Sequence, residues 1–230
     1  MSSQSKGPQL VGKSKLTYCV ITVAFALLGV SSLYGDSVSV DSTDFTGSRT
    51  SAPGGGITAT GPWADGGFEL SWNIADNQDG TFFYQYKITG LGGGTLAKDV
   101  KYWMMQLTPT IDWTGVFDDV GFSTEVGRFK KGKKNPGMPG DLFGLKFDDG
   151  TLEVSFVTDY APEWGSFYAQ GKGKNGDDAY NIGFGTDPTG TDFTNWIAVD
   201  GVSVPEPSTL ILLLSGTGLL AGAARFRKKT

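Results

Sequence analysis

Two neighbouring stretches of this chain alternate apolar and polar residues, and this period of two constrains the fold more than any other feature. In GFELSWNIA (67–75) the apolar positions are Phe68, Leu70, Trp72 and Ile74. In TFFYQYKIT (81–89) they are Phe82, Tyr84, Tyr86 and Ile88. Because successive side chains of a strand point to opposite faces of a sheet, each set marks one face of a β-strand. The turn-forming sequence DNQDG between them predicts a β-hairpin.

Other segments extend the β pattern over the body of the chain. LFGLKF and TLEVSFV, joined through Asp148-Asp149-Gly150, predict a second hairpin. KYWMMQLT (101–108) is apolar on both faces and predicts a buried strand. Further candidate strands lie at 116–122, 167–169, 180–184 and 196–202.

The remaining stretches of the body carry no helical signal. GSRTSAPGGGITATGP (47–62) is expected to form a flexible loop. No segment has the 3.6-residue period of an amphipathic helix. About eight or nine short strands with frequent turns predict a single all-β domain, an antiparallel β-sandwich or jelly roll.

The chain contains no histidine and a single cysteine, Cys19. The lack of histidine excludes Ser-His-Asp and Cys-His catalysis and histidine-ligated metals. Cys19 lies in a segment that we expect to be removed, so the mature protein would have neither a thiolate nucleophile nor a disulfide. We therefore expect no enzymatic activity, no cofactor and no metal site.

The first 35 residues have the layout of a secretory signal peptide. Lys6, Lys13 and Lys15 give a positive start, residues 16–30 are apolar, and small and polar residues follow. We expect export by the general secretion machinery and cleavage by signal peptidase, near Gly35. An uncleaved membrane anchor is the alternative, although a typical span needs ~20 apolar residues.

A second hydrophobic segment, Leu210 to Ala224, lies near the end of the chain. With the two residues before it, this segment reaches the ~17-residue lower limit of a membrane span. We therefore predict a transmembrane helix over 208–224 and a basic tail over 225–230. Positive charge stays on the cytoplasmic side, which places the body outside the cytoplasmic membrane. Just upstream, the prolines of Pro205-Glu206-Pro207 keep that tripeptide extended and accessible to a protease.

The order of these three parts resembles the PEP-CTERM sorting signal of Gram-negative bacteria, over 205–230. The resemblance implies recognition by an exosortase, a membrane cysteine protease, through Pro205, Glu206 and Pro207. It assigns the role of stop signal to Arg225, Arg227, Lys228 and Lys229. It further implies transient anchoring in the inner membrane through Leu210–Ala224, followed by display at the cell surface or in an extracellular polysaccharide matrix. A plain C-terminal anchor is the alternative.

The body between the two signals, 36–204, is acidic. It holds 12 Lys or Arg against 23 Asp or Glu, a net charge of −11, whereas the whole chain has −5. This charge disfavours nucleic acid and anionic lipid as partners. SWNI, KDVKYWMMQLTP, WGSFYAQG and AYNIGFG are similar to passenger domains that precede this sorting signal, which implies membership in a secreted β-rich group without a stated activity.

The acidic residues suggest two chemistries, each with a simpler alternative. Glu153 on a predicted strand and Glu163 in the following loop would have to converge to form the carboxylate pair of a glycosidase. Outward-facing strand carboxylates are common, so this remains the weaker interpretation. DNQDGT is similar to a calcium loop, but with Gly80 at the sixth position the first ligand position holds Ala75. A β-turn is therefore favoured there.

Two segments are candidate contacts for a glycan. RFKKGKKNPG (128–137) concentrates basic residues in an acidic body, and its lysines are Lys130, Lys131, Lys133 and Lys134. These lysines would hold an anionic polysaccharide by charge, and a solvated loop is the favoured alternative. In APEWGSFYAQG (161–171), Trp164 and Tyr168 would stack on sugar rings, and core packing is the favoured alternative.

Together these observations predict an exported, non-enzymatic protein of the cell surface or extracellular matrix, with a β-sandwich body at 36–204 and a structural or interaction role. A carbohydrate-binding module for exopolysaccharide is the first alternative. A bitopic membrane protein with an external β-domain is the second.

Overall fold

The computed structural model of the chain describes residues 38–117, 121, 123–148, 150–173, 177–188 and 190–203. The predicted signal peptide, transmembrane helix and basic tail lie outside the described residues, as does Pro205-Glu206-Pro207. Within the described ranges, no helix is long and apolar enough to cross a membrane.

The described part of the chain consists of antiparallel strands with three short helical elements. The strands are β1 (Thr46–Thr50), β2 (Ile57–Ala59), β3 (Glu69–Asp76), β4 (Phe82–Thr89), β5 (Val100–Gln106), β6 (Thr124–Phe129), β7 (Leu142–Phe147), β8 (Glu153–Thr158), β9 (Tyr160–Gly165), β10 (Phe167–Gly171), β11 (Asp178–Asn181) and β12 (Ile197–Ser203). The helical elements are α2 (Pro62–Gly66) and the 3₁₀ turns Ser42–Asp44 and Leu91–Gly93. The predicted all-β class is confirmed.

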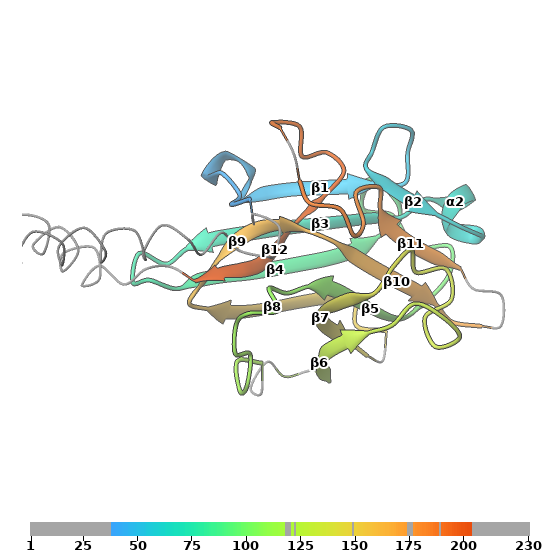
Figure 1. Cartoon of the computed structure of the whole chain (residues 1–230). Helices are drawn as coiled ribbons and strands as arrows, with labels where there is room; N and C mark the ends of the chain where they lie inside the picture. The colour runs from blue at the N-terminus through green and yellow to red at the C-terminus, as the bar shows by residue number, and fades with distance from the viewer. Residues whose placement is uncertain are drawn as a thin grey trace, which may run out of the picture. The chain divides into compact units, whose positions relative to one another are not determined.

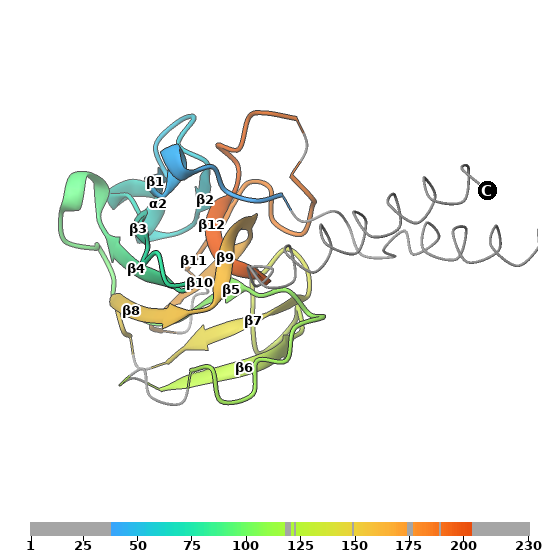
Figure 2. The ribbon, with the colours of Figure 1, turned by 90° about the vertical axis from the view of Figure 1, so that its left-hand side faces the viewer.

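The strands form two larger sheets and one strand pair (Figure 1). The four-stranded sheet has the order β1-β3-β4-β8, the six-stranded sheet has the order β2-β11-β10-β5-β7-β6, and β12 pairs with β9. In Figure 2, β3, β4 and β8 lie on the left, and β7 and β6 lie to the lower right. This layered arrangement is consistent with the predicted sandwich.

An aromatic core fills the space between the sheets. Tyr86 of β4 lies next to Trp103 of β5, with ring centroids 6.1 Å apart, and both side chains are fully buried. The hydroxyl of Tyr86 donates a hydrogen bond to the carbonyl of Ala198 on β12, at 3.1 Å. These contacts join the four-stranded sheet to both of the other sheets. Burying rings of this size is the main source of stability in such a core.

The first predicted hairpin is confirmed. β3 and β4 pair antiparallel with Trp72 opposite Tyr86, and the turn between them is the DNQDG sequence. Leu70, Trp72 and Ile74 are buried, as the alternation predicted. The 3₁₀ turn Leu91–Gly93 and the loop after it lead into β5. Trp103 and Met105 of β5 are fully buried, which confirms the prediction of a buried strand.

The second predicted hairpin is wrong, because β7 and β8 belong to different sheets. β7 pairs with β5 on one side and β6 on the other, while β8 pairs with β4. Both edges of β7 are therefore occupied, and β8 covers the open edge of β4 instead. The link at 148–150 carries the chain from one sheet to the other.

Two further expectations need correction at the sheet edges. The segment 47–62 was expected to be a flexible loop. In the structure it contains most of β1, all of β2 and the first residue of α2. β1 and β2 are outer strands of their sheets, and an edge strand needs no continuous apolar face. In the candidate strand at 116–122, the described residues form no strand, and the N–H of Val116 instead donates to Trp113 in a turn.

The segment after β8 forms two consecutive strands that change partners at Ser166. β9 pairs with β12, and β10 pairs with β5 and β11. Glu163 was expected in a loop, but it lies in β9 and is 3% exposed. On the other side of β9, the N–H of Val40 donates to the carbonyl of Pro162 at 3.0 Å. β9 is thus enclosed by β12 and by the first described residues.

The last strand, β12, is buried along most of its length and includes a carboxyl group. Ile197 to Asp200 are all fully buried. Asp200 accepts a hydrogen bond from the Thr158 hydroxyl at 3.0 Å. Burial raises the pKa of Asp200 well above its usual range, and the neighbouring charges of Glu163 and Asp159 raise it further. Burial therefore favours the neutral, protonated form of Asp200.

Candidate anion-binding groove

The lysine-rich segment folds back over the outer face of the six-stranded sheet. It follows β6, which pairs with β7, and β7 pairs in turn with β5. Side chains of directly paired residues share a face, so Glu125, Lys146 and Met104 lie in a row on this outer face. Together with the segment 130–135, this face lines a groove of about 840 Å³, here called the basic groove.

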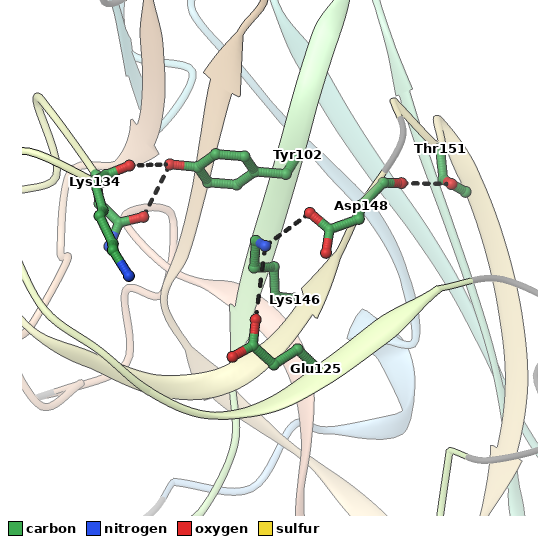
Figure 3. Close-up of polar contacts among 7 residues, drawn as sticks. Tyr102, Glu125, Lys134, Lys146, Asp148 and Thr151 are labelled. Carbon is green, nitrogen blue, oxygen red and sulfur yellow. Dashed lines mark hydrogen bonds and ion pairs between the residues drawn. The ribbon is translucent and has the colours of Figure 1, made fainter.

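Tyr102 attaches the segment to the sheet (Figure 3). Its ring is 4% exposed, and its hydroxyl is shared between the carbonyl of Lys134 at 2.9 Å and the amide oxygen of Asn135 at 2.8 Å. The amide nitrogen of Asn135 donates to the carbonyl of Lys130 at 2.8 Å. The backbone on both sides of the turn is therefore held by buried side chains rather than left to solvent.

A second tyrosine holds the next part of the segment. The hydroxyl of Tyr168 lies 2.6 Å from the carboxylate of Asp178 and also contacts the carbonyl of Pro136. A small outer core lies beside these bonds, formed by Tyr102, Met104, Met138, Leu142, Tyr168 and Phe184. This cluster is separate from the main core, and its Tyr102 also lines the basic groove.

Among the residues that the structure describes, seven cations and two acids line the basic groove. The lining residues are Lys101, Tyr102, Glu125, Arg128, Phe129, Lys130, Lys131, Gly132, Lys133, Lys134, Asn135, Lys146 and Asp148. The concentration of positive charge on a preformed surface can attract and retain an anion. No group of three or more acids suited to a metal ion occurs among the residues that the structure describes.

Two of these lysines already bind oxygens of the protein itself. Lys146 forms an ion pair with Asp148 at 2.7 Å and a longer one with Glu125 at 3.7 Å, and its ammonium lies 5.1 Å from the centre of the Tyr102 ring (Figure 3). The ammonium of Lys131 donates to the carbonyl of Pro139 at 3.0 Å. These contacts stabilise the shape of the groove.

The anchoring hydroxyls keep their protons across the physiological range. Burial raises the pKa of Tyr102 to about 12, and the charge of Asp178 contributes to that rise. Burial and the hydrogen bond to Asp178 raise the pKa of Tyr168 above its ordinary value as well. Burial also raises the pKa of Asp178, although its bond to Tyr168 opposes the change. The hydroxyl donors that fix the segment therefore persist around neutral pH.

The structure brings the four predicted lysines, Lys130, Lys131, Lys133 and Lys134, into one groove with exposed side chains. Sequence reasoning did not find Lys101, Lys146 or the anchoring role of Tyr102. Lys146 is the one charged residue of the strand LFGLKF, and this pattern could have indicated an outward-facing cation. Its position opposite Glu125 depends on strand register, which no local pattern gives.

The two predicted aromatic contacts are not available to a sugar ring. Trp164 is 4% exposed and packs against Trp72 and Phe193 in the main core. Tyr168 is fully buried under the lysine-rich segment. Both residues lie on strands whose two faces are covered, so the core-packing alternative describes them and the stacking role is withdrawn.

The two candidate catalytic carboxylates do not share a cleft. Glu153 lies at the outer edge of the four-stranded sheet, where its exposed side chain pairs with Lys87 at 3.5 Å. Glu163 is buried in β9 and accepts a hydrogen bond from Thr108 at 2.5 Å. In the DNQDG turn, the Asp79 carboxylate is engaged by Thr81 of the same turn, at 2.7 and 3.0 Å. This is the geometry of a β-turn.

Comparison with known proteins adds one finding at the end of the described fold. The described body is an antiparallel all-β domain, and directly after it a family model for the PEP-CTERM protein-sorting motif matches residues 203–228. The chain therefore carries this motif, which implies recognition by an exosortase, export and sorting to the cell surface. No curated protein and no solved structure matches the chain.

Proposed function

We propose that this protein is an exported, non-enzymatic component of the surface or extracellular matrix of a Gram-negative bacterium, and that its β-domain acts by binding. The observation that carries the proposal is the sorting motif, which begins at the last residue of β12. In this proposal the signal peptide directs export, the hydrophobic segment anchors the protein transiently in the inner membrane, and an exosortase then releases it.

Two features support a role without catalysis. The chain has no histidine, and its single cysteine lies in the segment assigned to the signal peptide. The carboxylates considered for glycoside hydrolysis, Glu153 and Glu163, lie in separate environments, one exposed and one buried. General acid–base catalysis needs both groups beside the same bond.

The intact mass of the protein from its native cells tests the sorting step. We would compare the wild type with a variant in which Pro205-Glu206-Pro207 is replaced by Ala-Ala-Ala, and with Ser208→Ala as a matched neighbouring control. Loss of the hydrophobic segment in the wild type and the control, but not in the variant, is the expected result. Retention of the segment in all three would refute exosortase processing and favour a bitopic membrane protein with an external β-domain.

A second candidate function is that of a carbohydrate-binding module for exopolysaccharide. The basic groove supports it, because Lys130, Lys133 and Lys134 project from a segment that Tyr102 and Asn135 hold in place. A glycan array probed with the exported protein, with the sugar products analysed in parallel, tests it. Binding without turnover is expected. Turnover that is lost in Glu153→Gln or Glu163→Gln would contradict the non-enzymatic proposal.

A further inference from the structure

The charge of the body is divided unequally between the basic groove and the rest of its surface. Among the described residues, seven of the 11 cations line the groove with only two of the 19 acids, which leaves four cations against 17 acids elsewhere. A polyanion is therefore repelled by most of the body and attracted at one place. Such a distribution restricts an anionic ligand to a single site and a defined orientation.

The cations of the groove also differ in their availability. Lys131 and Lys146 are engaged with protein oxygens, as described above. Among the described residues, no acidic side chain forms an ion pair with Arg128, Lys133 or Lys134, and the same holds for Lys101 and Lys130. All five of these side chains belong to exposed residues. Five cations are thus free to meet an external anion.

We propose that the basic groove binds a linear acidic polysaccharide by charge, through Lys101, Arg128, Lys130, Lys133 and Lys134, without recognising individual sugar rings. This inference rests on the second candidate function above and specifies its ligand class. The available cations come from β5, from the end of β6 and from the segment after it, rather than from one point. A volume of about 840 Å³ lies at the upper end of the range for small-molecule sites, which suits a segment of a polymer.

The aromatic residues of the groove argue against ring stacking and against a nucleic acid. Tyr102 is 4% exposed, and the ammonium groups of Lys101 and Lys146 lie 5.4 and 5.1 Å from the centre of its ring. Phe129 is partly buried against the outer core. Proteins that bind single-stranded nucleic acids combine basic grooves with open aromatic platforms, which these two residues do not provide.

The predominance of lysine over arginine also favours recognition by charge alone. Six of the seven groove cations are lysines, and only Arg128 has a planar guanidinium. A lysine ammonium acts as a point charge, whereas the guanidinium fork selects phosphate and carboxylate geometry through paired hydrogen bonds. A lysine-dominated groove therefore depends on charge density along a polymer, and its affinity must fall steeply with salt.

The test measures binding by the exported protein, purified from its native cells, to three probes at neutral pH. The probes are alginate as a linear polyuronate, dextran as a neutral polymer of similar length, and oligothymidylate as a single-stranded nucleic acid. We expect saturable binding of alginate at one site per protein, and none of dextran. Oligothymidylate binding as tight as that of alginate would overturn the choice of a polysaccharide, and tight binding of dextran would overturn the reliance on charge.

Two charge-matched variants identify the site. The double variant Lys133→Gln/Lys134→Gln removes two groove cations, and Lys87→Gln/Lys172→Gln removes two cations elsewhere. Each groove lysine is expected to contribute roughly fivefold in affinity, so the first variant should bind alginate roughly twenty-five-fold more weakly. The control should remain within about twofold of the wild type. Equal losses in both variants would show a diffuse charge effect and refute the groove as the site.

The salt dependence gives an independent measure of the contacts. A plot of the logarithm of affinity against the logarithm of salt concentration should become shallower by about one for each groove lysine removed. An unchanged slope in Lys133→Gln/Lys134→Gln would refute direct contact. The proposed sorting is tested separately by intact mass, so failure of one experiment leaves the other interpretable: an unprocessed protein that binds alginate would refute sorting alone.

Discussion

Asp200 gives the sharpest prediction about stability, because its carboxyl group is fully buried and burial disfavours its charged form. Its burial raises the pKa well above the usual range, and it accepts a hydrogen bond from Thr158. A raised pKa means that the folded state binds the proton more tightly than the unfolded state. This stabilising contribution is fully present below the unfolded pKa, about 3.9, and is lost as the pH rises towards the folded pKa.

The substitution Asp200→Asn removes this titration while keeping the size of the side chain and an oxygen that can accept from Thr158. In the wild type, each pH unit above about 3.9 should lower the free energy of unfolding by about 1.4 kcal/mol until the folded pKa is passed. As the pH rises from about 4 to about 6, the stability of the variant should therefore rise relative to that of the wild type. At low pH, the unpaired amide N–H groups should make the variant less stable, by about 1–3 kcal/mol.

Urea unfolding followed by tryptophan fluorescence, repeated at several pH values, measures this difference. Glu153→Gln is the matched control, because it also replaces a carboxylate by an amide, but at an exposed position on the edge of the four-stranded sheet. If the difference between Asp200→Asn and the wild type were constant across this range, Asp200 would not be the titrating group, and the inferred neutral carboxyl would be wrong.

Further predictions concern the six-stranded sheet and the segment that lines the groove. Gly144→Ala should destabilise the fold by about 1–3 kcal/mol, because a methyl group there would overlap the carbonyl oxygen of Met105. Gly127→Ala, at the directly paired position with open space around it, should change the urea midpoint much less. Tyr102→Phe should cost about 1 kcal/mol and speed up hydrogen exchange in 130–135, since its hydroxyl holds that backbone. Unchanged exchange there would show that the segment is held by other contacts.

Local patterns predicted the strands that face the core but not the way those strands assemble. The alternation in 67–75 and 81–89 identified β3 and β4 because one face of each is buried and the other is polar. The turn sequence at 148–150 is equally typical of a hairpin, but in the structure it connects β7 and β8, which belong to different sheets. A turn sequence specifies a change of direction, whereas the partner of a strand depends on which sheet edge is open, and that is a long-range property.

The weakest predictions were at edge strands and at positions buried on both faces. β1 is a polar outer strand, β2 is an outer strand of only three residues, and β9 contains Pro162, so all three lacked the usual strand signals. For Trp164 and Tyr168, the residue type was compatible both with stacking on a sugar ring and with packing in the core. Only the tertiary structure shows that other segments cover these side chains. The basic cluster was visible in the sequence, but its attachment through Tyr102 required the tertiary fold.

The position of β12 has a consequence for the timing of export. This strand is the last part of the domain to be synthesised, and yet its buried residues complete the core and satisfy the hydroxyl of Tyr86. Until residue 203 has emerged, the sandwich lacks that strand, and the sorting motif at 203–228 follows it immediately. We expect closure of the domain and recognition of the motif to occupy the same short interval. A substitution that delays the insertion of β12 would then appear as a sorting defect, although the motif itself is intact.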